Sequence, residues 1–104
     1  MSEQKQFHIG LIGLGVMGRN LALNMEDKGF PVAVWNRRSE AITEFLSQNR
    51  DRRFGGDPEM ARFVAMLERP RRILLMIKAG DPVDQVIERL IPLLEPGDII
   101  MDGG

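Results

Sequence analysis

The sequence lacks cysteine altogether and has a single histidine and a single tryptophan among its 104 residues. Without cysteine there is no disulfide, no thiolate nucleophile and no cysteine ligand for a metal ion, as is typical of a protein from the reducing cytoplasm. No charge of one sign dominates: the net charge is −1, so no global electric field attracts nucleic acid or an anionic membrane. The longest uninterrupted apolar run, residues 73–77, is far too short to span a bilayer. We therefore expect a cytoplasmic location and neither a nucleic-acid nor a membrane partner.

Internal repeats, low-complexity segments and linkers rich in Pro, Gly or Ser are also missing. A chain of 104 residues is long enough for one small domain and no more. Hydrophobic residues make up 43% and charged residues 28% of the chain, which is the profile of a globular protein. The sequence therefore predicts a single domain over residues 1–104.

Segments with strand-like and helix-like patterns alternate along this domain. Apolar runs predict five strands, at residues 9–12, 31–35, 53–55, 73–77 and 99–101. Helical spacing predicts four helices between them, at residues 16–28, at residues 40–48, behind Asp57-Pro58 and behind Asp81-Pro82. In both Asp-Pro pairs we expect the aspartate to cap the helix and the proline to take its first position.

Two patterns indicate which side chains are buried. Residues 73–77 are apolar throughout, which predicts a parallel strand covered on both faces. The last helix has apolar residues at regular three- and four-residue spacing, which predicts a buried face. Its members are Val83, Val86, Ile87, Leu90, Ile91 and Leu94.

This alternation predicts right-handed crossovers and a parallel sheet with helices on both faces. The fold class is therefore α/β, a Rossmann-type doubly wound sheet with strand order 3-2-1-4-5 and a ligand crevice at the carboxyl ends of strands one and four. No helix follows the fifth strand, and sheets of this kind normally carry more strands. We expect the fold to be truncated there.

The first strand leads into a glycine-rich segment with the pattern G-x-G-x-x-G. The segment is Gly13-Leu14-Gly15-Val16-Met17-Gly18. In this pattern the first glycine allows the tight turn, the second lets the backbone approach a pyrophosphate, and the third lets the helix pack closely. The phosphate then lies on free N–H groups at the helix N-terminus. The alternative is a tight strand-to-helix turn with no ligand, but the strand before it and the helix after it favour a dinucleotide.

The second strand ends in Asn36-Arg37-Arg38, where an NAD site usually carries a carboxylate that binds the ribose hydroxyls. A carboxylate would repel a 2′-phosphate, whereas a guanidinium binds it through two hydrogen bonds. Asn36 remains able to bond the ribose region. These residues indicate NADP, unless Arg37 and Arg38 are ordinary surface charges before a helix.

Two further loops follow the fourth and fifth strands at the same edge of the sheet. By topology, Lys78-Ala79-Gly80 faces the glycine turn, and its small residues leave room for a ring or a ribose. The sequence leaves open whether Lys78 contacts a phosphate or points to water. Asp102-Gly103-Gly104 indicates either a close approach of backbone to ligand or a tight turn. No metal cluster and no catalytic triad is recognisable in the sequence.

Four stretches of the chain resemble the N-terminal coenzyme domain of decarboxylating 6-phosphogluconate dehydrogenases. They are residues 16–25, Asn36-Arg37, residues 70–80 and residues 97–104. Other β-hydroxy acid dehydrogenases share the glycine turn, but we do not expect both the Lys-Ala-Gly loop and the Asp-Gly-Gly ending in them. The family usually has alanine where this chain has Gly15, and Ser or Thr where it has Arg38.

The resemblance implies a set of coenzyme contacts and a reaction. Gly13 to Gly18 would hold the pyrophosphate, Asn36, Arg37 and Arg38 the 2′-phosphate and adenosine, and Ile77, Lys78 and Ala79 the ribose and nicotinamide side. The parent enzyme would oxidise and decarboxylate 6-phosphogluconate to ribulose 5-phosphate, in the pentose phosphate pathway and gluconate utilization, as a homodimer when full length. The family's catalytic lysine and glutamate lie in later parts, so we expect these 104 residues alone to have no turnover. The alternatives are another β-hydroxy acid dehydrogenase and a non-catalytic NADP-binding module.

Overall fold

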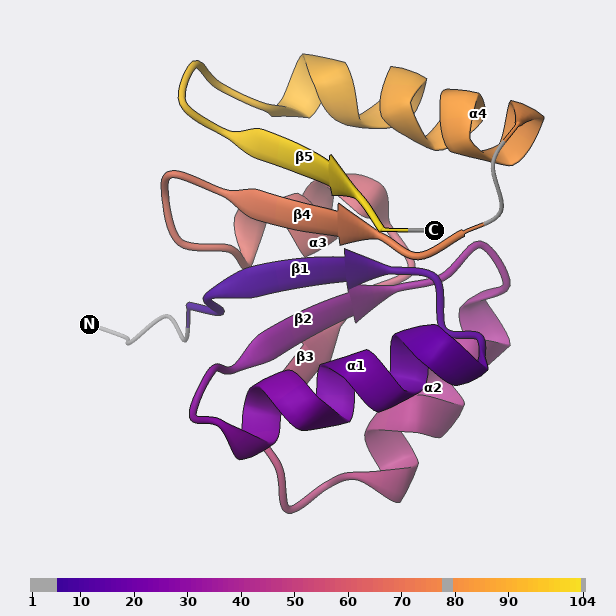
Figure 1. Ribbon diagram of the computed structural model, residues 1–104, viewed down its shortest axis with the longest axis vertical. Helices are drawn as coiled ribbons and strands as arrows, with labels where there is room; N and C mark the ends of the chain where they lie inside the picture. The colour runs from indigo at the N-terminus through magenta and orange to yellow at the C-terminus, as the bar shows by residue number, and fades with distance from the viewer. Residues whose placement is uncertain (1–5, 78–79, 104) are drawn as a thin grey trace.

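The computed structural model describes residues 6–77 and 80–103. Strands and helices alternate along these residues, and each takes its place in a single sheet or on one of its sides (Figure 1). In chain order the elements are β1 (Ile9–Ile12), α1 (Val16–Asp27), β2 (Val32–Trp35), α2 (Ser39–Gln48), β3 (Phe54–Gly56), α3 (Met60–Ala65), β4 (Arg72–Leu75), α4 (Asp81–Leu90), the 3-10 helix η1 (Ile91–Leu93) and β5 (Ile99–Asp102).

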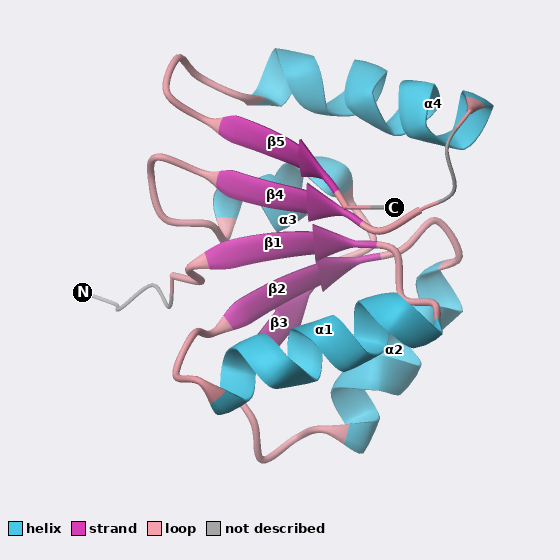
Figure 2. Cartoon of the chain, in the orientation of Figure 1, coloured by secondary structure: helices cyan, strands magenta, loops and turns pink. Residues whose placement is uncertain are grey.

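The five strands form one sheet in the order β3-β2-β1-β4-β5, and every neighbouring pair is parallel. All arrowheads therefore point the same way in Figure 2, so that the carboxyl ends share one edge. Ile12 of β1 is in register with Trp35 of β2 and with Leu75 of β4. This arrangement confirms the predicted Rossmann-type fold and its order, and it places the reversal of strand order between β1 and β4.

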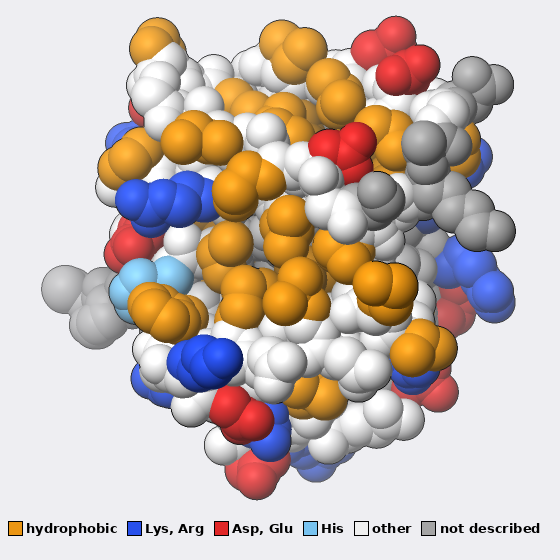
Figure 3. All heavy atoms as spheres, in the orientation of Figure 1, with side chains coloured by type: hydrophobic (Ala, Val, Ile, Leu, Met, Phe, Trp, Pro, Cys, Tyr) orange, Lys and Arg blue, Asp and Glu red, His pale blue; other side chains and the backbone are white. Residues whose placement is uncertain are grey.

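Helices cover the two sides of the sheet unequally. In Figure 2, α1 lies in front of the sheet and α3 behind it. Every residue of β2 is buried, whereas β4 alternates, with Ile73 and Leu75 buried and Leu74 half-buried. Apolar side chains gather in Figure 3 over the area where β1, β4 and β5 run in Figure 1. The prediction that the fourth strand is covered on both faces is therefore wrong for the described residues.

The ends of several elements differ from the sequence predictions. β4 ends at Leu75, so Met76 and Ile77 lie beyond it. α3 begins at Met60 with Glu59 as its N-cap, so Asp57 is not the N-cap that was predicted. The Asp57 carboxylate accepts a hydrogen bond from the Glu59 N–H at 2.8 Å. This i to i+2 bond makes an Asx-type turn immediately before the helix.

The last helix also departs from its predicted form. Gly80, not Asp81, is the N-cap of α4, with a φ of 110°. The α-helix ends at Leu90 and tightens into η1, whose three residues per turn rotate the following side chains away from the earlier stripe. Val83, Val86 and Leu90 are buried as predicted, but Ile91 is 62% exposed.

An ion pair that the sequence analysis missed fastens the amino edge of the sheet. The Arg71 guanidinium lies 3.1 Å from the Asp98 carboxylate, and the two side chains are only 9% and 2% exposed. Asp98 also accepts hydrogen bonds from the Arg71 and Glu95 backbone N–H groups, at 2.7 and 2.8 Å. The pair thereby ties the start of β4 to the turn that precedes β5.

Candidate functional site

The turn after β1 depends on a glycine whose backbone is left-handed. Gly13 has a φ of 109°, a conformation that other residues rarely adopt. Its N–H donates to the Trp35 carbonyl at 2.9 Å, which holds the start of the turn beside the end of β2. A Cβ at this position would collide with the Met76 carbonyl and with the Ile77 side chain. The segment after β4 thus packs directly against the turn.

The two later glycines differ in what surrounds them. A Cβ on Gly18 would collide with the Gly13 carbonyl, so α1 packs against its own turn only because this residue has no side chain. By contrast, no described atom lies within 4 Å of the position that a Cβ on Gly15 would take. The backbone of Gly15 therefore borders open space, which is what a diphosphate needs in order to approach it.

Gly15 is also the N-cap of α1, and no side chain among the described residues caps this helix end. The first N–H groups of a helix have no partner within the helix, and they attract anions together with the helix dipole. Val16 and Met17 in this first turn are 66% and 71% exposed, so side chains do not cover it. An exposed, uncapped helix N-terminus of this kind is chemically suited to a phosphate group.

Asn36 joins this turn to the segment after β2. Its Oδ1 accepts a hydrogen bond from the Leu14 N–H at 2.8 Å, and its Nδ2 donates to the Arg38 carbonyl at 3.1 Å. The same carbonyl accepts from the Ala41 N–H at 3.1 Å, at the start of α2. The side-chain amide of Asn36 therefore bridges the glycine turn and the two residues Arg37-Arg38, called here the arginine segment.

A hollow of about 350 Å³ opens between the glycine turn, the arginine segment and the start of α2. Arg38 lines it, whereas Arg37 is exposed and is not among the residues that form its wall. Glu40 and Glu44 of α2 also line it, and sequence analysis missed both because it looked for a carboxylate only at the end of the strand. The full lining comprises Leu14, Gly15, Asn36, Arg38, Glu40, Ala41 and Glu44.

The other predicted site residues fall on the loops after β4 and β5. Ile77 is half-buried beside Gly13, at the edge where the turn lies. Lys78 and Ala79 lie outside the described residues. Gly103 donates its N–H to the Leu75 carbonyl at 2.9 Å, which holds the end of β5 beside that of β4. The structure thus brings the described site residues to one edge of the sheet.

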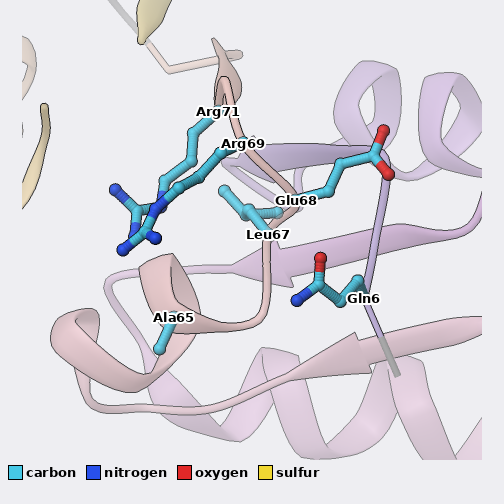
Figure 4. A pocket seen from close by; sticks show the side chains of 6 residues that line it. All are labelled: Gln6, Ala65, Leu67, Glu68, Arg69 and Arg71. Atoms are coloured by element: carbon cyan, nitrogen blue, oxygen red, sulfur yellow. The ribbon is translucent and has the colours of Figure 1, made fainter. Parts of the chain in front are cut away.

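A second hollow, of about 540 Å³, lies at the opposite edge (Figure 4). Arg69 and Arg71 point into the same region there, but Arg69 is paired with Glu95 at 3.0 Å and Arg71 with Asp98. Because both guanidinium charges are already neutralised, this hollow is a poor anion site. Its lining is Gln6, Ala65, Leu67, Glu68, Arg69 and Arg71.

The described part of the chain offers neither a metal cluster nor a membrane-spanning helix. Residues 6–77 and 80–103 hold no group of three or more His, Cys, Asp or Glu side chains that could bind a metal ion. Over the same ranges, every helix is too short or too polar to cross a membrane.

A parallel 3-2-1-4-5 sheet with an open glycine turn and an uncapped helix at its switch point defines a dinucleotide-binding domain. Comparison with known proteins narrows this class. A family model described as the NAD binding domain of 6-phosphogluconate dehydrogenase matches residues 8–104. The chain belongs to this family, which confirms the resemblance found in the sequence.

Individual relatives agree with the family model. The chain is 56% identical over 100 residues to a decarboxylating 6-phosphogluconate dehydrogenase of Chlamydia pneumoniae, covering 95% of this chain and 21% of that protein. It is 50% identical over 104 residues to the NADP(+)-dependent, decarboxylating enzyme of Bacillus subtilis, covering 100% of this chain and 22% of the relative. The chain therefore spans about a fifth of the length of the curated relatives it matches.

A solved structure supports the same fold. The 6-phosphogluconate dehydrogenase of Plasmodium falciparum, studied in its apo form and with its cofactor NADP+ or its substrate, superposes with a TM-score of 0.84. It is 41% identical, and the match covers 93% of this chain and 21% of that one.

Proposed function

We propose that this chain binds NADP at the carboxyl edge of the sheet, as the coenzyme domain of a decarboxylating 6-phosphogluconate dehydrogenase. The supporting observation is that Gly15, at the uncapped start of α1, and Arg38 line the same hollow. The diphosphate lies on the N–H groups that follow Gly15, and the 2′-phosphate is met by Arg38 and Arg37. Ile77, with Lys78 and Ala79 after it, lines the nicotinamide side.

The charges around the hollow explain why the arginines decide coenzyme preference. Glu40 and Glu44 each bring a negative charge to the wall, and Arg38 is the one cation among the described lining residues. A 2′-phosphate entering beside two carboxylates is repelled unless guanidinium groups pair with it. Without the arginines, the same hollow would suit the uncharged ribose hydroxyls of NAD, which carboxylates bind.

The proposed parent reaction is the oxidation and decarboxylation of 6-phosphogluconate to ribulose 5-phosphate. The names of the Bacillus and Plasmodium relatives support it, because they join NADP with this activity or this substrate. We further infer that the full-length protein is a cytoplasmic homodimer. The 104-residue chain alone binds coenzyme without turnover, since it spans only a fifth of the relatives' length.

Charge reversal at the arginines tests the coenzyme assignment. We expect Arg38→Glu and Arg37→Glu each to weaken NADP binding by about 100-fold, because charge-assisted hydrogen bonds are replaced by repulsion. NAD has no 2′-phosphate, so its affinity changes by less than about threefold. Isothermal titration of each variant with both coenzymes measures the ratio.

Arg50→Glu is the matched control, because Arg50 is an exposed arginine beyond the end of α2 and outside the hollow. It should leave both affinities unchanged. Equal losses of NADP and NAD affinity in the Arg37 and Arg38 variants would refute the role of these side chains in binding the 2′-phosphate. A wild-type chain that binds neither coenzyme would refute the proposed function itself.

A further inference from the structure

We propose that Asn36 is a positioning residue that holds the diphosphate turn and the arginine segment in place relative to each other, through hydrogen bonds from its side chain to the backbone of both. This inference rests on the proposed function, because it assigns a part within the same site. It adds a structural role to the sequence prediction, in which Asn36 bonds the ribose region.

The hydrogen bonds of the carboxamide carry the inference. Asn36 follows β2 directly and is half-buried, with Oδ1 2.8 Å from the Leu14 nitrogen and Nδ2 3.1 Å from the Arg38 oxygen. Leu14 itself is 6% exposed, so the bond it makes lies behind the open surface of the turn. The polar atoms of Asn36 are thus engaged with backbone on both sides.

The bond to Leu14 also distinguishes the N–H groups of the turn that have an acceptor in the protein from those that do not. A buried N–H must find an acceptor, and Asn36 supplies it for Leu14. The N–H groups after Gly15, at the uncapped end of α1, remain directed at the space where a diphosphate would lie. Leu14, predicted as a coenzyme contact, lines the hollow, but its N–H is already bonded to Asn36.

Position 36 explains why an amide suits an NADP site. It is the place after the second strand where an NAD site carries a carboxylate. Aspartate would also accept the Leu14 N–H, but its charge would repel the 2′-phosphate and its oxygen would face the Arg38 carbonyl. Asparagine makes the same bond to the turn without the charge, and its Nδ2 adds the bond to the arginine segment.

The first test needs no coenzyme. In Asn36→Ala the Leu14 N–H loses its acceptor, so its hydrogen-exchange rate measured by NMR should rise at least about tenfold relative to wild type. Exchange at Leu11 and Ile12 in β1 should not change. Asn36→Asp should restore the protection of Leu14, because a carboxylate oxygen accepts the same bond. Unchanged exchange at Leu14 in Asn36→Ala would overturn the inference.

The second test is titration of the same variants. Because the diphosphate is common to both coenzymes, Asn36→Ala should weaken NADP and NAD by the same factor, about tenfold. Asn36→Asp should bind NAD nearly as wild type does while losing NADP affinity. Asn49→Ala is the matched control, since the Asn49 amide also bonds a backbone carbonyl, that of Phe45 at 2.8 Å, but away from the site. It should change neither affinity.

The outcomes separate the two proposals. If Asn36→Ala weakens NADP far more than NAD, Asn36 contacts the 2′-phosphate or its ribose, and the positioning role is refuted while NADP binding stands. If neither affinity changes in Asn36→Ala, the hydrogen bonds of Asn36 to Leu14 and Arg38 have no part in coenzyme binding, and the inference is also refuted. If the wild-type chain binds neither coenzyme, both the proposed function and the inference that rests on it are refuted.

Discussion

At the scale of single residues, the glycine motif combines positions with opposite tolerance for a side chain. A Cβ on Gly18 would collide with the Gly13 carbonyl, whereas a Cβ on Gly15 would enter open space. Gly18→Ala should therefore destabilise the fold by about 1–3 kcal/mol, as overpacking does, despite the better helix propensity of alanine. Gly15→Ala should change stability by less than about 1 kcal/mol, because its φ of −71° suits any residue.

Urea unfolding of both variants beside wild type measures this difference as a shift in midpoint at constant slope. Gly15→Ala serves as the control for a glycine-to-alanine change in the same turn. Similar midpoint losses in the two variants would contradict the packing argument, since they would place a neighbouring atom close to Gly15 as well.

The sequence predicted the residues of this turn because spacing along one chain segment determines them. It did not predict the hydrogen-bond partners of Asn36. The Leu14 N–H, which donates to the Asn36 Oδ1, lies 22 positions earlier in the sequence. Nor did it predict that Glu40 and Glu44 line the hollow, which depends on how α2 packs beside the turn. Local pattern identified the candidate residues, and tertiary packing decided what each one touches.

At the scale of elements, the link between β4 and β5 depends on the buried Arg71–Asp98 pair. Burial raises the pKa of Asp98, but hydrogen bonds from the Arg71 and Glu95 backbone and from the Arg71 guanidinium outweigh it and lower the pKa below its ordinary value of 3.8. A lowered folded-state pKa stabilises the fold above the unfolded-state value, and this contribution disappears as the pH falls through the folded-state pKa.

Asp98→Asn should therefore cost about 3–5 kcal/mol near neutral pH, because it leaves the Arg71 charge buried without its partner. The difference from wild type should stay constant down to the ordinary pKa of 3.8 and shrink below it, as Asp98 in the wild type becomes protonated. Urea unfolding at a series of pH values measures it.

Asp51→Asn provides the comparison, since Asp51 is exposed beyond the end of α2. Its stability should follow that of wild type at every pH. An Asp98→Asn curve that runs parallel to wild type into the acid range would show that ionisation of Asp98 contributes nothing.

The elements themselves were predictable where periodicity is strong, and less so at their ends. The core spacing of α4 placed Val83, Val86 and Leu90 correctly, and all three are buried. Ile91 was placed wrongly because a change from α to 3-10 geometry shifts the buried face without altering the pattern of residue types. The same limit applies to Asp57, whose side chain satisfies a turn instead of a helix.

At the scale of the whole molecule, the two edges of the sheet differ in chemistry. At the amino edge, Arg53, Arg69 and Arg71 each form an ion pair, that of Arg53 with Glu26 at 3.2 Å. At the carboxyl edge, Arg37 and Arg38 are exposed beside free helix N–H groups. The asymmetry places the attraction for a phosphorylated ligand at the edge where the strand order reverses.

The front of the molecule carries apolar side chains that helices cover incompletely (Figure 3). Phe30 and Ile99 are 48% and 50% exposed, and Leu74 in the middle of the sheet is half-buried. The sequence indicated full burial here because an all-apolar strand is typical of a sheet covered on both faces. Strand composition alone does not determine how much of each face of the sheet the helices cover.

Coenzyme binding and turnover make different demands on these 104 residues. Binding requires the turn, the helix end and the arginines, which are present, whereas hydride transfer also requires a substrate site and a general base beside the nicotinamide. The resemblance places the catalytic lysine and glutamate in later parts of the family's chain. We therefore expect the 104-residue chain to bind NADP but to produce no NADPH from 6-phosphogluconate, with the full-length Bacillus subtilis relative as positive control for the absorbance assay. NADPH formation that scales with the concentration of this chain, and that Arg38→Glu abolishes, would instead place the catalytic groups within these residues.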